Sequence, residues 1–147
     1  DANMPDFTGL FKILEQFQQP VFRAEHLFHC FMSAYLVKLV DHRNRHIRSI
    51  AIFGLSQHGT KKHAPVLLKL IKNNKDAYTA AKGLKRVAGG TYRSEWEKLF
   101  KFHKDRNVRL IAAEALLSQN QRRIVEQEAK RTDDRGLKVS LNKMLLN

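Results

Sequence analysis

The sequence predicts an all-α protein, a solenoid in which about four helix pairs stack behind a short N-terminal helix. The first observation is a five-residue block of small and apolar residues, Ala51–Leu55, which returns as Ala80–Leu84, Ala112–Leu116 and, in degenerate form, Leu141–Leu145. The second is a further segment before each block, with apolar residues at the helical spacings of three and four. The third is that 147 residues contain only three prolines and seven glycines, which leaves long stretches free of helix breakers.

The N-terminal part differs from the repeats. A capping helix is predicted at about residues 6–18, because its apolar side chains form one stripe, made of Phe7, Leu10, Phe11, Leu14 and Phe17. The next predicted helix, from Val21 to about Val40, is apolar nearly all round. Such a helix lies between neighbours or binds a partner. We therefore take Phe28 and Phe31 as a candidate apolar interface.

The copies of the block are separated by 29, 32 and 29 residues. These offsets, and the turn residues between them, divide a single domain of residues 1–147 into repeats at about 21–58, 61–89, 92–118 and 121–147. Small residues at fixed places on a helix let its backbone approach a neighbour closely, and the apolar residue at the end of the block fills the shared core.

The first helix of each predicted pair contributes the other half of the core. Its apolar residues are Leu36 and Leu39, then Leu67, Leu70 and Ile71, then Trp96, Leu99 and Phe100, then Ile124, Val125 and Ala129. Trp96 is thereby assigned to the core and not to a surface site.

Two segments, Asn107–Leu116 and His46–Ala51, resemble the second helix of HEAT repeats, and the short variant found in phycobilisome-lyase-like proteins is nearest in length. The resemblance covers about residues 35–147 and implies a right-handed α–α superhelix. The resemblance says little about function, because this repeat occurs in scaffolds, adaptors, lyases and nucleic-acid enzymes alike.

The resemblance also gives a role to three basic residues. It implies that Arg48, Arg109 and Lys138 tie adjacent repeats together through acids such as Asp41 and Asp105. The second repeat departs from the pattern, with Asp76-Ala77 where an apolar–basic pair is usual.

The formal charge of +13 is concentrated in the middle of the chain. Residues 38–109 hold eighteen basic and five acidic side chains, residues 1–37 hold two and four, and residues 110–147 hold seven and five. A concentrated positive field attracts nucleic acid, an acidic protein or an anionic membrane surface.

Lys82, Lys85 and Arg86 share part of one helix surface, at spacings of three and four residues. With Lys61, Lys62 and Arg93 they form the candidate binding site for a polyanion. We expect a non-enzymatic interaction scaffold that recognises an acidic protein partner.

The alternative is nucleic-acid binding through phosphate contacts, with Tyr78 and Tyr92 as candidates for base stacking, since neither falls in a core stripe. A DNA-glycosylase-like activity, which some similar solenoids have, is a remote alternative, because Trp96 belongs to the core and inner acids are few. A third hypothesis is a structural adaptor that binds through the apolar Val21–Val40 helix and the last repeat.

Neither a catalytic nor a metal site is expected. Acidic pairs such as Glu95/Glu97 and Asp133/Asp134 lie one or two residues apart and do not share a helix face. The pairs His26/His29, followed by Cys30, and His42/His46 lack a third and fourth metal ligand. We therefore predict no cofactor.

The chain ends on Met144-Leu145-Leu146-Asn147 without a polar cap helix, so Met144 and Leu145 are a candidate interface for homo-oligomers. No apolar run approaches the ~20 residues that span a bilayer, and the lone Cys30 forms no internal disulfide. We expect a cytoplasmic protein whose natural start is Met4, with a processed secreted form as the alternative.

Overall fold

The computed structural model describes residues 32–88 and 90–146. These residues are helical or in connecting turns and contain no strand, which confirms the all-α prediction. The predicted cap helix, Phe28, Phe31 and the His26–Cys30 segment lie outside the described residues. After helical residues 32–39 the elements are α3 (Arg45–His58), η1 (Lys61–His63), α4 (Ala64–Lys72), α5 (Ala77–Ala88), α6 (Arg93–Phe102), α7 (Arg106–Ser118), α8 (Arg122–Arg131) and α9 (Arg135–Leu146).

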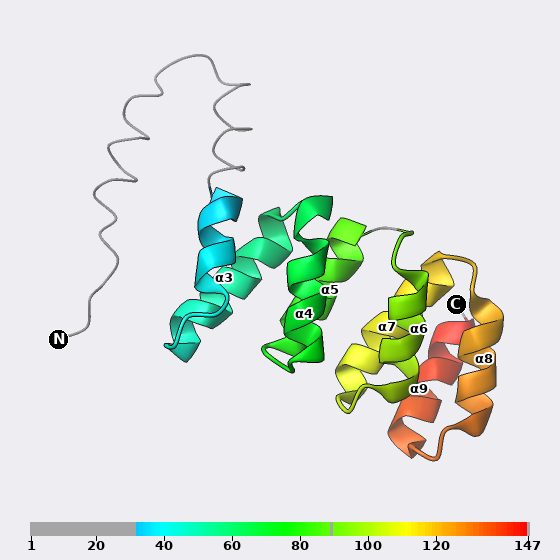
Figure 1. The fold of residues 1–147 in the computed structure, drawn as a ribbon. Helices are drawn as coiled ribbons and strands as arrows, with labels where there is room; N and C mark the ends of the chain where they lie inside the picture. The colour runs from blue at the N-terminus through cyan, green and yellow to red at the C-terminus, as the bar shows by residue number, and fades with distance from the viewer. Residues whose placement is uncertain (1–31, 89, 147) are drawn as a thin grey trace, which may run out of the picture.

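The helices pack mainly against their neighbours in the chain and against the next helix but one. α4 packs on α5, α6 on α7 and α8 on α9, while α5 also contacts α3 and α7, and α7 also contacts α9. Figure 1 shows the pairs following one another along the molecule in chain order, from α3 in cyan to α9 in red. The helices α3, α5, α7 and α9 therefore form one continuous row.

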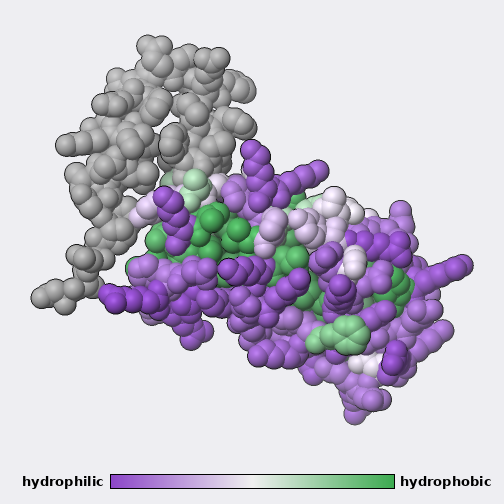
Figure 2. All heavy atoms as spheres, in the orientation of Figure 1, coloured by the Kyte–Doolittle hydropathy of each residue, from purple (hydrophilic) through white to green (hydrophobic). Residues whose placement is uncertain are grey.

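The recurring block supplies the centre of the core, as predicted. Its first and last positions are fully buried in α3, α5 and α7, at Ala51 and Leu55, Ala80 and Leu84, and Ala112 and Leu116. Trp96 is also fully buried, as its place in the apolar stripe of α6 predicted. Hydrophilic residues cover most of the face seen in Figure 2, with smaller hydrophobic patches between them.

A glycine sets the distance between α3 and α5. A Cβ atom on Gly83 would lie 2.5 Å from Ser56 Oγ and 2.7 Å from Ser56 Cα. The Ser56 hydroxyl is buried there, 2.8 Å from the Ile52 carbonyl oxygen and 3.0 Å from that of Thr79, and shares its one proton between them. The two helices are thus held at a separation that only glycine permits.

Side-chain caps fix where three helices of this row begin. Asn44 accepts a hydrogen bond from the His46 amide, and Asp105 accepts one from the Asn107 amide, at the starts of α3 and α7. Asp134 accepts one from the Leu137 amide at the start of α9. These bonds satisfy amides that would otherwise have no intrahelical partner.

Asparagines in the left-handed conformation end α4 and α7. Asn74 has φ 55° and Asn120 has φ 58°. In each case the next amide donates to a carbonyl five residues back, Lys75 to Leu70 and Gln121 to Leu116. This is the Schellman arrangement, which asparagine tolerates better than most residues other than glycine.

Arg109 joins two helix pairs, but not through the acid that the resemblance suggested. Its guanidinium donates to the Phe100 carbonyl oxygen on α6 at 2.8 Å and to Glu128 on α8 at 3.0 Å. Asp105 instead caps α7. Arg48, at the matching place on α3, donates to the His42 carbonyl oxygen at 3.0 Å.

No helix among the described residues combines the length and the apolar character that a membrane span requires.

Candidate functional site

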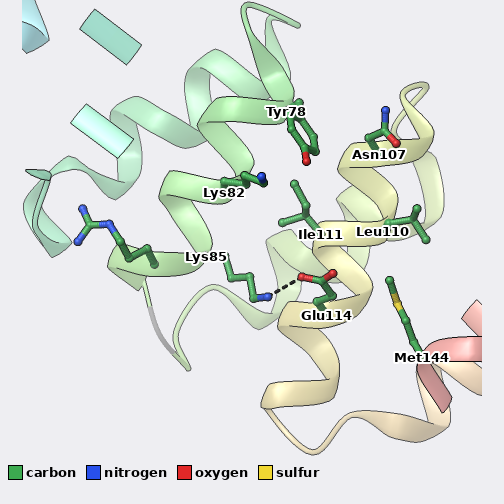
Figure 3. A pocket seen from close by; sticks show the side chains of 9 residues that line it. Tyr78, Lys82, Lys85, Asn107, Leu110, Ile111, Glu114 and Met144 are labelled. Carbon is green, nitrogen blue, oxygen red and sulfur yellow. Dashed lines mark hydrogen bonds and ion pairs between the residues drawn. The ribbon is translucent and has the colours of Figure 1, made fainter. Parts of the chain in front are cut away.

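A groove of about 480 Å³ lies between α5 and α7 and reaches the end of α9. Its walls are four residues of α5 (Tyr78, Lys82, Lys85, Arg86), four of α7 (Asn107, Leu110, Ile111, Glu114) and Met144 of α9. Three of the predicted cationic residues and one residue of the predicted apolar interface therefore share one groove (Figure 3).

Tyr78 and Lys82 stand one helical turn apart on α5. The Lys82 ammonium lies 4.8 Å from the centre of the Tyr78 ring, within the range of a cation–π contact. Tyr78 is 43% exposed. Figure 3 shows both side chains reaching from α5 toward α7. This wall of the groove offers an aromatic face and an exposed positive charge.

Lys85 and Glu114 form an ion pair across the groove. The Lys85 ammonium lies 2.6 Å from a carboxylate oxygen of Glu114, as the dashed line in Figure 3 marks. Both side chains are substantially exposed, so solvent screens the pair and its net contribution to stability is small. The groove thus contains a negative charge among its positive ones.

Arg86 has a structural role as well as a place in the groove. Its guanidinium donates to the Ser56 carbonyl oxygen at 2.6 Å and to the Gly59 carbonyl oxygen at 2.8 Å. These are carbonyl groups at the C-terminal end of α3, where a cation is favourable to the helix dipole. Arg86 therefore ties α5 to α3, and Lys82 is the less constrained cation of the groove.

The floor of the groove is apolar. Ile111 is buried, while Leu110 and Met144 are half-buried and pack against the core. An aliphatic or aromatic side chain of a ligand would be removed from water there, which is favourable by roughly 25 cal/mol for each Å² buried.

The other predicted site residues lie apart from this groove. Lys61 and Lys62 are exposed on η1, which packs against the side of α5. Arg93 forms an ion pair of 3.0 Å with Glu97 on its own helix, α6. Leu145 packs against the core, and the strongly exposed apolar residue at this end is Leu146.

The structure corrects one of the two proposed stacking residues. Tyr92 lies directly before α6 and packs against the core, so it is not a free ring for base stacking. Its backbone is in the left-handed region, with φ 64°. Tyr78 keeps an exposed ring.

Leu110 and Glu114 line the groove but were not among the predicted site residues. Both could have been found from the repeat, because they follow Tyr78 and Lys82 by 32 residues, the middle offset of the block. Positions related by that offset lie on neighbouring helices of the row, where they meet the same groove.

The groove lies in the most basic part of the chain. From residue 42 to residue 94 there are twelve basic side chains and one acidic, Asp76. The Asp76 carboxylate accepts a hydrogen bond from the Ser49 hydroxyl at 3.1 Å. The field around the α5 wall is therefore strongly positive.

Residues 32–88 and 90–146 contain no group of three or more His, Cys, Asp or Glu side chains arranged to hold a metal ion. His42 and His46 were expected to form a helical pair, but His42 lies in the turn before α3. One of its ring nitrogens accepts a hydrogen bond from the Asn44 amide at 3.1 Å.

Comparison with known proteins gives no further guide, since no protein-family model, curated protein or solved structure matches the chain.

Proposed function

We propose that this protein is a non-enzymatic interaction module that binds an acidic, amphipathic segment of a partner protein in the α5–α7 groove. The observation that carries the proposal is the combination of an apolar floor, Leu110, Ile111 and Met144, with the cationic wall of Lys82 and Lys85. Carboxylates of the partner would meet the lysines while its apolar side chains cover the floor, the arrangement used by grooves that bind amphipathic helices.

Glu114 favours a peptide over a nucleic acid. A nucleic-acid backbone carries a charge at every phosphate, so a carboxylate on the wall of the groove repels it. A peptide can place a neutral or basic residue opposite Glu114. An acidic peptide therefore matches the charges of the groove better than a phosphate chain does.

Nucleic-acid binding is the second candidate. It is supported by the twelve basic and one acidic side chains of residues 42–94 and by the exposed ring of Tyr78. These features allow phosphate contacts and one stacked base. They do not account for the apolar floor.

We further propose that the helix pairs form a right-handed HEAT-like superhelix with repeats at 21–58, 61–89, 92–118 and 121–147. The continuous row of α3, α5, α7 and α9 supports this arrangement. In a superhelix of this kind the second helix of each pair lines the concave side, which would place the groove there.

Fluorescence anisotropy with the full 147-residue chain tests the proposed function. The probes are a labelled acidic amphipathic peptide of about 20 residues and labelled single- and double-stranded oligonucleotides, each titrated across a salt series. We expect peptide binding to persist at ~150 mM salt and oligonucleotide binding to fall steeply before that point. Oligonucleotide binding that persists there, and exceeds binding to a sulfated polymer, would put the second candidate first.

A pair of charge reversals assigns the binding to the groove. Lys82→Glu should weaken peptide binding by at least about tenfold, because it places like charges together in the groove. Lys98→Glu, on the exposed face of α6, changes the net charge equally and serves as the matched control. Equal losses in the two variants would show that only the overall field matters.

A further inference from the structure

The groove is one part of a regular surface that crosses three helices. Tyr78, Leu110 and Val139 occupy the same place on α5, α7 and α9, since they are separated by the repeat offsets of 32 and 29 residues. Tyr78 and Val139 are exposed, and Leu110 is half-buried. Because α7 packs against both α5 and α9, the repeat offsets place the three side chains in a row across the helices, beside Met144, the α9 residue that lines the groove itself.

A second row runs beside the first, one helical turn further along each helix. It consists of Lys82 on α5, Glu114 on α7 and Lys143 on α9, related by the same two offsets. All three side chains are exposed. The charges along this row alternate: positive, negative, positive.

The spacing of the rows determines which partner fits them. Packed helices lie roughly 8–10 Å apart. Seven residues of an α-helix advance by about 10 Å and return to the same face. A partner helix that crosses α5, α7 and α9 would thus present one apolar residue and one flanking charged residue to each of them, once in every heptad.

We infer that the surface selects a partner helix whose flanking charges read acidic, basic, acidic in three successive heptads. The two acidic residues would meet Lys82 and Lys143, and the basic residue would meet Glu114, while the apolar residues cover Tyr78, Leu110 and Val139. Glu114 already binds Lys85, but a carboxylate accepts several hydrogen bonds and can hold a second cation. This inference rests on the proposed function and adds the charge order that the partner must carry.

The inference is tested with three labelled helical peptides of about 21 residues that share one apolar stripe. Their flanking charges read acid–base–acid, acid–acid–base and acid–acid–acid. The first two have the same net charge and differ only in order. We expect the full-length protein to bind the acid–base–acid peptide at least about tenfold more tightly than the acid–acid–base peptide, because like charges that face each other are strongly unfavourable.

A charge reversal in the middle of the row gives a stronger test. Glu114→Lys makes the row uniformly positive, so the variant should prefer the acid–acid–acid peptide to the acid–base–acid peptide. Glu126→Lys is the matched control, because Glu126 is similarly exposed (43%, against 44% for Glu114) and also pairs with a basic residue, Arg122, but lies on α8. The control should keep the preference of the unmodified protein.

Four outcomes would overturn the inference. Equal affinity for the two peptides of the same net charge would show that charge order is not read. An equal change of preference in Glu126→Lys would show that the position of the carboxylate is irrelevant. Undiminished binding of the acid–base–acid peptide after a central proline is introduced would exclude the helix. If none of the peptides binds, the proposed function fails as well, whereas binding that follows net charge alone removes only the inference.

Discussion

Gly83 has a hydrogen atom where other residues have a side chain, and this allows α5 to approach α3 closely. Gly83→Ala therefore tests how much this close packing contributes to stability. The new Cβ would lie 2.7 Å from Ser56 Cα, and a backbone atom cannot move aside as the end of a side chain can. We expect a loss of about 1–3 kcal/mol in the free energy of unfolding, the usual range for overpacking. Urea unfolding followed by circular dichroism measures it.

Gly136→Ala is the matched control, since it is also a helical glycine. There the three atoms nearest to the Cβ would belong to the guanidinium group of Arg106, the closest at 2.6 Å, at the end of a flexible and exposed side chain. Alanine favours helix by up to ~1 kcal/mol over glycine, so stability should stay the same or rise. A loss as large as that of Gly83→Ala would mean that steric contact with Ser56 is not the cause.

Arg109 is the second residue with a large expected effect. Its side chain and that of Glu128 are only 15% and 13% exposed, so the pair is shielded from water. Arg109→Met would leave the Glu128 carboxylate and the Phe100 carbonyl oxygen without their donor, and we expect a loss of about 2–4 kcal/mol in the free energy of unfolding. Thermal and urea unfolding of the variant check this value.

Arg93→Met provides the comparison for that prediction. Arg93 is 57% exposed and pairs with Glu97 within the same helix. An exposed pair of this kind contributes ~0.5 kcal/mol or less. Similar losses in the two variants would contradict the claim that burial makes the Arg109 pair important.

At the scale of the helices, the stabilisation that the Asp134 cap gives to the start of α9 is predicted to depend on pH. The Leu137 amide hydrogen bond, followed by the Arg106 guanidinium, holds the pKa of the Asp134 carboxyl below its usual value of 3.8. A carboxyl whose pKa is lowered by folding stabilises the fold above the pKa of the unfolded chain, and this stabilisation disappears as the pH falls through the folded pKa. Asp134→Asn keeps a cap but removes the charge.

The free energy of unfolding should therefore differ between the wild type and Asp134→Asn by a constant amount above about pH 5. The difference should shrink below about pH 4. Urea unfolding at a series of pH values measures it, with Asp133→Asn as a control that removes the same charge one residue away. A difference that does not depend on pH would show that the Asp134 charge has no part in capping α9.

The starts of α3, α7 and α9 could be predicted from local sequence because a short motif specifies each of the three. His42, His103 and Thr132 each accept a hydrogen bond from the amide of the capping residue two positions later. The sequence His42-Arg43-Asn44-Arg45 is echoed by His103-Lys104-Asp105-Arg106. The α4–α5 connection departs from this motif and uses a left-handed Asn74 instead. Interactions within a few residues are therefore readable from the sequence.

For the whole molecule, the helix positions and the core residues could be predicted from periodicity. The partners of the charged side chains could not. Residues such as Leu84 and Trp96 were assigned correctly because burial repeats with the helical period. The ion pair of Lys85 with Glu114 joins residues 29 positions apart, and it depends on how two helices are aligned. The binding of Arg86 to carbonyl groups of α3 depends on the same alignment. Composition alone therefore overestimated how many basic side chains are available to a partner, because Lys85 and Arg86 already bind groups within the protein.

Because the apolar floor lies within a strongly positive field, the association and dissociation rate constants should respond differently to salt. Long-range attraction should accelerate encounter with an acidic peptide, so the association rate constant should fall about tenfold or more as salt screens the field. Escape from the groove instead requires the half-buried side chains of Leu110 and Met144 to return to water, a step that salt barely affects. We expect the dissociation rate constant in stopped-flow measurements to change by less than about twofold over the same salt range. A parallel rise in dissociation would mean that charge alone holds the partner; otherwise the time a partner stays bound is set by the two uncharged side chains of the floor that water reaches.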